Sequence, residues 1–129
     1  MYRDCYTWPT VKFIGGDAHS FVFTLYSNDG TIFAAPDALE YNFALVDYCN
    51  RNYMEPIISI DYNSQVRDYR FRFGTSGDIQ DRVIVTLAND DTKDLYGKYI
   101  YQLTIKKTDG TIRIPGQGIA EIFKNINPG

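Results

Sequence analysis

Side chains that could carry out chemistry are few in this sequence and widely spaced. His19 is the only histidine among 129 residues, and no second histidine or suitably spaced cysteine accompanies it. A zinc site needs three or four nitrogen or sulfur ligands, and a Ser-His-Asp triad needs a histidine fixed between two partners. We therefore interpret His19 as a surface or turn residue, and we expect no metal and no cofactor.

Carboxylates offer two further chemistries. Asp90, Asp91 and Asp94 supply oxygens of the kind that calcium prefers, but the run lacks the spacing and the glycine of an EF-hand loop. Capping of a single helical turn by Asp91 is the better interpretation, because an aspartate accepts hydrogen bonds from free backbone N–H groups. Glycoside hydrolysis would need two carboxyl groups roughly 5–10 Å apart, a gap that a sequence does not show. The carboxylates considered for it are Glu40, Asp47, Asp61, Asp78, Asp81 and Glu121.

Basic residues gather at Arg67, Arg70 and Arg72 and again at Lys106 and Lys107. The formal net charge of the chain is −3, whereas nucleic-acid binding normally needs a basic face. We therefore interpret the arginines as part of a solvated outer sheet face or of a salt-bridged subunit contact, and we expect no nucleic-acid partner.

Aromatic residues are abundant, with 11 Tyr, 8 Phe and one Trp. Many tyrosines lie in loops or off the predicted inward faces, and exposed Tyr and Trp are enriched at protein interfaces and suit stacking on sugars. We expect an interface, with a glycan as the alternative partner. The predicted interface residues are Tyr2, Tyr6, Trp8, Tyr48, Tyr53, Arg70 and Arg72.

The two cysteines, Cys5 and Cys49, do not form a disulfide framework, and the sequence leaves open whether they pair with each other. The first 20 residues contain no apolar signal-peptide core, and no run approaches the roughly 18 apolar residues of a membrane span. We therefore expect a soluble chain made in a cytoplasm, with no membrane partner.

The elements that must position these side chains are short strands. Apolar residues alternate in residues 20–27, 40–47, 66–73 and 99–105, and turn residues separate these runs. In 66–73 the alternation places Tyr69, Phe71 and Phe73 inward and Arg70 and Arg72 outward. Further strands are expected at 10–14, 31–34, 57–62, 83–87, 111–114 and 119–126, with a terminal helix as the competing interpretation of the last.

Two Asp-Gly pairs, at 29–30 and 109–110, are hairpin signals, and residues 74–81 read as a loop. About eight or nine short strands with period-2 alternation predict an all-β fold, a single antiparallel sandwich. Residues 1–9 form an aromatic arm that packs on its own domain or on a neighbour, and residues 10–127 form the sandwich. Between two strands, Leu95 is expected to enter the core as a plug, and Gly97 to adopt positive φ.

A family resemblance rests on these same elements. The run Val85-Thr86-Leu87, the acidic turn 90–94, the strand 95–103 and the Asp-Gly hairpin at 109–110 are followed by a closing strand that begins at Gly118. Together with Gly16-Asp17 ahead of the strand beginning at 21, this order resembles small immunoglobulin-like domains of tailed-phage virion proteins. The amino-terminal domain of the phage baseplate upper protein and related tail and head fibre modules are examples.

The resemblance implies an immunoglobulin-like sandwich that is a non-enzymatic structural component of a tailed bacteriophage virion. Baseplate, tail, collar and capsid-attached positions all remain open. Such a protein would act by assembly with other virion proteins or with copies of itself, as a homo-oligomer or in multiple copies, and would be located in the virion. A carbohydrate-binding or host-adhesion module on the same sandwich is the alternative.

Overall fold

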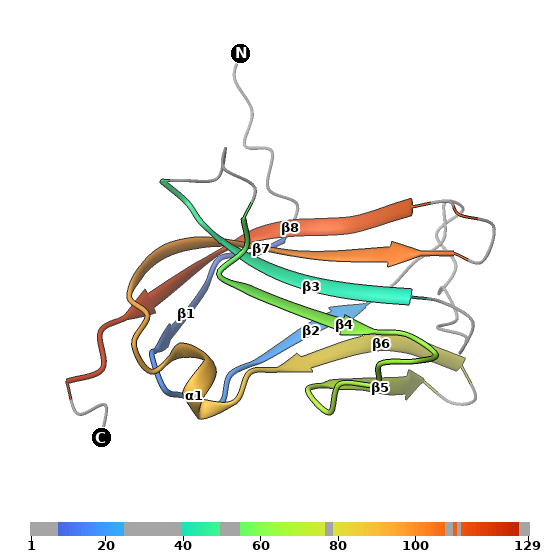
Figure 1. Ribbon diagram of the computed structural model, residues 1–129, viewed down its shortest axis with the longest axis horizontal. Coiled ribbons are helices and arrows are strands. Elements are labelled where there is room, and N and C mark those ends of the chain that lie inside the picture. Colours follow the sequence, from blue (N-terminus) through green and yellow to red (C-terminus); the bar gives the residue numbers. More distant parts are fainter. Residues whose placement is uncertain are drawn as a thin grey trace, which may run out of the picture.

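The protein is described by a computed structural model, which covers residues 8–24, 40–49, 55–76, 79–107, 110 and 112–126. Within these described ranges, eight strands and one short helix follow one another (Figure 1). They are β1 (Val11–Ile14), β2 (Ser20–Thr24), β3 (Glu40–Asp47), β4 (Ile58–Tyr62), β5 (Phe71–Ser76), β6 (Ile79–Thr86), α1 (Asn89–Thr92), β7 (Gly97–Lys106) and β8 (Ile112–Phe123).

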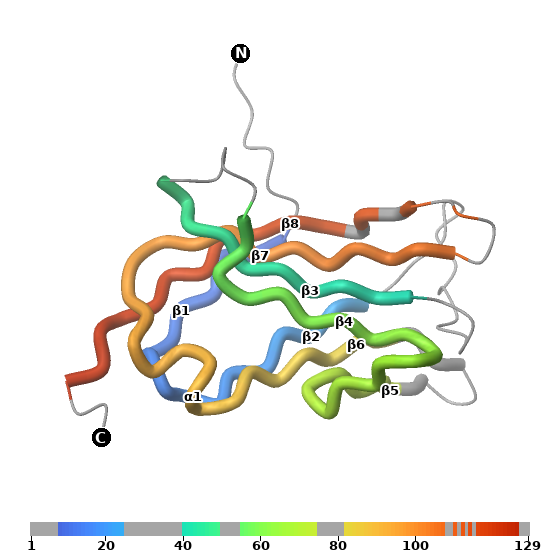
Figure 2. Tube along the Cα trace, in the orientation of Figure 1, coloured from blue at the N-terminus to red at the C-terminus, as the bar shows by residue number. Residues whose placement is uncertain are grey.

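The strands form two layers, which Figure 2 shows as two stacked groups of tubes. A five-stranded sheet has the order β1-β8-β7-β3-β4, and a three-stranded sheet has the order β2-β6-β5. In the immunoglobulin convention, β8-β7-β3-β4 follows the order G-F-C-C′ and β2-β6-β5 follows B-E-D. The predicted all-β, immunoglobulin-like sandwich is therefore confirmed.

One pair of strands departs from the expected antiparallel arrangement. β1 pairs with β8 in parallel, with Val11 opposite Ala120 and Ile14 opposite Phe123, whereas every other strand pair is antiparallel. The chain leaves β1 through Gly15 and Gly16 and begins the opposite sheet at β2, so β1 is free to add to the edge of the first sheet.

The core consists of the inward side chains of both sheets. On β3, Tyr41, Phe43 and Leu45 are buried as the alternation predicts, and the strand bounds match the expected 40–47. Phe21 of β2 lies 4.9 Å from Tyr101 of β7 and 5.0 Å from Phe43, measured between ring centroids. Aromatic pairs at this spacing add to the stabilisation from burial, and here they join the two sheets.

The predicted plug between β6 and β7 is present, but its central residue is different. Leu95 is only partly buried against the core, whereas Thr92 is fully buried. The Thr92 hydroxyl accepts a hydrogen bond of 2.9 Å from the Gly16 amide, which ties α1 to the turn after β1. Gly97 has φ of 119°, as predicted for the residue that starts β7.

The prediction for 66–73 is correct only in its second half, where Phe71 is buried, Phe73 packs against the core and Arg72 is exposed. Tyr69 was expected inward but is 77% exposed, because the strand begins only at Phe71 and a turn precedes it. Asn63 accepts hydrogen bonds from the amides of Gln65 and Val66, and Asp68 accepts one from the amide of Arg70. Such local side-chain bonds offer the backbone an alternative to pairing in a sheet.

Two other boundaries also differ from expectation. β5 and β6 extend into the predicted loop 74–81, and β8 is one strand of 12 residues where two strands, 111–114 and 119–126, were expected. β8 runs through Pro115 because its register against β7 shifts between Leu103 and Ile105. A bulge of this kind accommodates a residue that cannot donate to the ladder. The alternative of a terminal helix is wrong through Phe123.

β7 and β8 are antiparallel neighbours, as the Asp-Gly signal at 109–110 predicts. Gly110 has φ of 89°, and its amide donates to the Lys107 carbonyl. The earlier hairpin signal at 29–30 and the strand expected at 31–34 lie outside the described residues. In the part of the chain that the structure describes, no helix is long and apolar enough to cross a membrane.

Candidate interaction surfaces

The end of the predicted arm is attached to its own domain. The Trp8 amide donates to the Gln117 carbonyl at 3.2 Å, and the Tyr101 hydroxyl donates to the Pro9 carbonyl at 2.7 Å. The Trp8 ring lies 4.5 Å from Phe23 and stacks on Tyr101. Trp8 thus fills a space between the two sheets, and its rings contact the core.

Two glycines of β8 lie against these aromatic rings, and their lack of a side chain makes room for the rings. A methyl group at Gly116 would lie closer than 3.0 Å to the Trp8 ring, and one at Gly118 would collide with the Tyr101 ring in the same way. The backbone of β8 therefore approaches the rings directly, and any larger residue would displace them.

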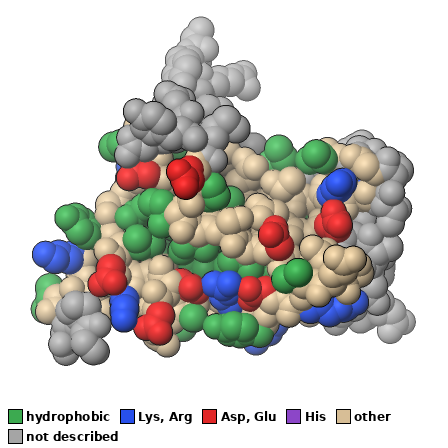
Figure 3. Space-filling model, viewed as in Figure 1, with side chains coloured by type: hydrophobic (Ala, Val, Ile, Leu, Met, Phe, Trp, Pro, Cys, Tyr) green, Lys and Arg blue, Asp and Glu red, His purple; other side chains and the backbone are tan. Residues whose placement is uncertain are grey.

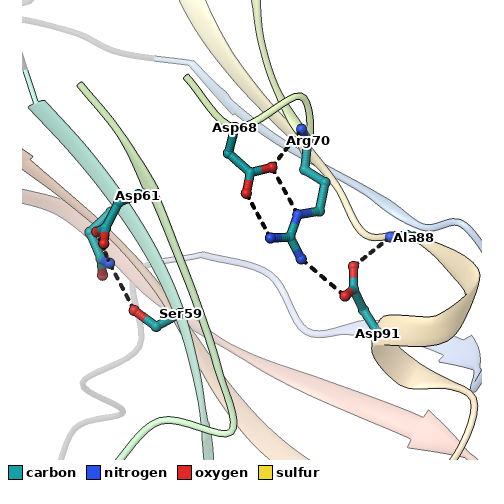
Figure 4. A network of polar contacts seen from close by, with 7 residues as sticks. Ser59, Asp61, Asp68, Arg70, Ala88 and Asp91 are labelled. Atoms are coloured by element: carbon teal, nitrogen blue, oxygen red, sulfur yellow. Dashed lines mark hydrogen bonds and ion pairs between the residues drawn. The ribbon is translucent and has the colours of Figure 1, made fainter. Parts of the chain in front are cut away.

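Arg70 connects the turn before β5 to α1 (Figure 4). Its guanidinium donates two hydrogen bonds to the Asp68 carboxylate, at 2.9 and 2.7 Å, and one of 3.0 Å to Asp91. The side chains of all three residues are only 19–20% exposed. The bonds from Arg70 hold the pKa of Asp68 below its usual range. The geometry places Arg70, a predicted interface residue, in an internal network.

Asp91 completes this network at the start of α1. Its second oxygen accepts a hydrogen bond of 2.7 Å from the Ala88 amide, so the third residue of the helix reaches back to the residue that precedes it. Asp91 accepts from a backbone N–H at the start of the helix, as predicted, but it does so as the third residue of α1, whereas Ala88 occupies the N-cap position. Asp90 pairs with Lys93 at 3.5 Å, and no group of three or more metal-ligating side chains occurs among the described residues.

The other predicted interface residues are dispersed. Arg72 points outward from β5 and donates to the Thr86 hydroxyl, while the Tyr48 ring lies beneath the Lys98 ammonium at 4.8 Å on the other sheet. Tyr2, Tyr6 and Tyr53 lie outside the described residues, as does Cys5. Cys49, next to Tyr48, is exposed with a free thiol.

His19 lies in the turn before β2, as expected, but its ring is half-buried. It stacks on Phe13 at 4.4 Å with an angle of 2° between the planes, and it meets Phe21 edge-on at 5.0 Å. Burial lowers the pKa of His19, and the nearby Asp17 carboxylate opposes this effect.

An exposed apolar row lies at one end of the five-stranded sheet and was not recognised from the sequence. Ile14 of β1 is opposite Phe123 of β8, and Tyr96 precedes β7, whose Gly97 is opposite Ile122. Their exposed fractions are 56%, 52% and 64%, respectively. We call Ile14, Phe123 and Tyr96 the apolar row. The sequence does hold a signal for Phe123. Ala120 and Ile122 are inward, so period-2 alternation along 119–126 assigns Phe123 to the outer face.

Polar and charged groups surround the apolar row. The Lys124 ammonium lies 5.8 Å from the Tyr96 ring, and Lys12 pairs with Glu121 at 3.7 Å. Farther along the same outer face, Asn42 donates to Ser59 and Asp61 (Figure 4), and Gln117 donates to Gln102. Figure 3, in the orientation of Figure 1, shows hydrophobic side chains interspersed with acidic and basic ones on this side of the molecule. An apolar area with a polar surround is typical of a protein interface.

Comparisons with known proteins add one structural similarity. No protein-family model matches the chain, and no curated protein matches it significantly. Among solved structures, the chain is similar to CopC from Methylosinus trichosporium OB3b, with 12% sequence identity and a TM-score of 0.35. The match covers 84% of this chain and 98% of the CopC chain.

Proposed function

We propose that this protein is a non-enzymatic structural component of a tailed bacteriophage particle and acts by protein–protein association. The observation that carries the proposal is the apolar row, in which three large side chains from adjacent segments are each more than half exposed. Contiguous exposed apolar side chains with a polar surround mark sites of association in soluble proteins. The resemblance of residues 83–123 to phage immunoglobulin-like modules supports the assignment to a phage particle.

Two sets of long-range contacts, around Arg70 and around Trp8, support a structural role. Arg70 ties the turn before β5 to α1, and Trp8 ties the first described residues to β7 and β8. Both connect segments that are distant in sequence, so both stiffen the sandwich. A rigid domain associates at a lower entropic cost than a flexible one, because fewer groups must be ordered on binding.

Mass spectrometry of gradient-purified particles produced from the genome that encodes this chain tests whether the protein is part of a phage particle. We expect the chain in the particles in multiple copies, at a constant ratio to the major capsid protein. Its absence from intact particles would contradict the proposal.

The role of the apolar row is tested by Phe123→Ser, with Val22→Ser as the matched control. Val22 is 57% exposed on the outer face of the other sheet, so both changes remove an exposed apolar side chain. We expect Phe123→Ser to reduce incorporation into particles and Val22→Ser to leave it unchanged. Equal incorporation of the two variants would exclude the apolar row as the contact.

A glycan remains the alternative partner, and the exposed rings of Tyr69 and Tyr96 are the side chains that favour it. Trp8 uses its ring faces within the domain, against Phe23 and Tyr101. Binding of the purified protein on a glycan array, lost in Tyr96→Ala or Tyr69→Ala and retained in Trp8→Phe, would support the adhesion role instead.

A further inference from the structure

The five-stranded sheet ends on its two sides in strands whose outward side chains carry opposite charge. Among the described residues, β1 pairs only with β8 and β4 pairs only with β3, so each presents one backbone edge. The exposed side chains of β1 are Lys12 and Ile14, and those of β4 are Ser59 and Asp61. An edge of this kind is a template for pairing with another chain.

We propose that copies of this chain join edge to edge, with β4 of one copy pairing antiparallel to β1 of the next. This inference rests on the proposed function, because it names the partner as a second copy and gives the contact by which the copies assemble. The contact uses two different surfaces of each copy, so it is heterologous and extends around a ring or along a row.

The direction of the strands permits this pairing without a reversal. β1 is parallel to β8, and each later step from β8 through β7 and β3 to β4 is antiparallel, so β1 and β4 run in opposite directions. When neighbouring copies keep the same orientation along the strands, β4 of one therefore lies antiparallel to β1 of the next. The sheet then continues from copy to copy.

One register matches the two edges in both burial and charge. With Lys12 opposite Asp61, Phe13 falls opposite Ile60 and Ile14 opposite Ser59. Phe13 and Ile60 are both buried side chains of their own domains, so the inward faces of the two sheets remain aligned. A shift by one residue would set inward positions against outward ones, which specifies the register strongly.

The charges favour pairing of β1 with β4 over pairing of either strand with its own copy. Glu55, which precedes β4, is a second exposed carboxylate on that side of the sheet. On the other side Lys12 pairs with Glu121 at 3.7 Å, but its side chain remains 63% exposed. Pairing β1 with β1 would bring lysines together, and pairing β4 with β4 would bring carboxylates together, whereas the unlike pairing joins opposite charges. One Asp61 oxygen accepts from Asn42 at 2.8 Å, which fixes the carboxylate at this edge.

The free length of each edge is short. β1 has four residues, and the end of β4 is used by a bridge between Tyr62 and Arg67, which leaves residues 58–61. The contact therefore spans about four residues of each strand. The adjacent apolar row and the exposed Ile57 and Val66 beside β4 supply apolar area next to it.

Disulfide trapping tests the contact in a chain whose own cysteines are replaced (Cys5→Ser with Cys49→Ser). One preparation carries Lys12→Cys and another carries Asp61→Cys. Residues directly opposite in an antiparallel pair have Cβ atoms about 4.5–5.5 Å apart, near the spacing that a disulfide needs. We expect a covalent dimer when the two preparations are mixed and oxidised, and none from either preparation alone.

The control mixture combines Lys12→Cys with Val22→Cys, which is also exposed but lies on the other sheet. A yield in this mixture equal to that with Asp61→Cys overturns the proposal, as does a dimer formed by Asp61→Cys alone, which would show β4 pairing with itself. Association of the wild-type chain without trapping of the Lys12–Asp61 pair overturns the edge contact and leaves the proposed function intact. Absence of the chain from particles contradicts the proposed function whatever the trapping shows.

Discussion

The contact between Trp8 and the bare backbone of Gly116 provides the sharpest prediction for stability. Gly116→Ala places a methyl group closer than 3.0 Å to the Trp8 ring, and Gly116 does not need positive φ. The cost should therefore come from overpacking, which is typically about 1–3 kcal/mol. Trp8→Ala should cost about 2 kcal/mol, since truncating a fully buried aromatic residue costs about 3–5 kcal/mol and Trp8 is half-buried.

The two changes should compensate each other. Once the ring is removed, Gly116→Ala meets no obstacle there and should be neutral or should stabilise by roughly 0.5–1 kcal/mol, because alanine costs less chain entropy than glycine. Urea unfolding of the four proteins in this cycle should give a coupling free energy of about 2 kcal/mol.

Gly97→Ala serves as the control, because it has positive φ and open space around it. Its cost should be the same with and without Trp8. If Gly116→Ala is as costly in the Trp8→Ala background as in the wild type, the contact does not exist and the attachment of the arm to β8 is wrong.

Four further predictions concern the internal contacts. Arg70→Ala should destabilise by about 1.5–3 kcal/mol, because it leaves two partly buried carboxylates without their cation. Arg72→Ala should change stability by less than about 0.5 kcal/mol, and urea unfolding distinguishes the two variants. Since the pKa of Asp68 is lowered in the folded state, stability should fall as pH drops below about 4, the unfolded value, and Arg70→Ala should weaken that dependence. The lowered pKa of His19 means that the unfolded state binds the proton more tightly, so stability should fall as pH drops below about 6.5. NMR titration of this single histidine gives its pKa directly, and an unshifted pKa would contradict the stacking of its ring on Phe13. Tyr101→Phe should cost about 1 kcal/mol and increase proteolysis near Pro9, because it removes the bond to the Pro9 carbonyl.

The sequence was sufficient for the inward faces of the regular strands. In β3 the alternation of Tyr41, Phe43 and Leu45 gave both the bounds and the buried side, because one buried face imposes a period of two. The segment around Tyr69 failed for a local reason, since Asn63 and Asp68 bond to nearby amides and replace a strand by turns.

Long-range contacts were beyond the sequence. Nothing in the run around Trp8 indicates that its ring would meet Gly116, or that β1 would pair in parallel with β8. Arg70 alternates with inward residues and was assigned to the surface, yet Asp91 lies 3.0 Å away because the fold brings α1 to the turn before β5. Such contacts depend on the crossing of chain segments, which local pattern does not encode.

The central claim of this account is that the domain works by association. Light scattering of the purified full chain, measured from low to high micromolar concentration at low salt, tests it most directly. We expect a mass that rises to a defined multiple of one chain and falls when Phe123→Ser or Lys12→Glu is introduced. A mass of one chain at every concentration, with no change in either variant, would contradict self-association.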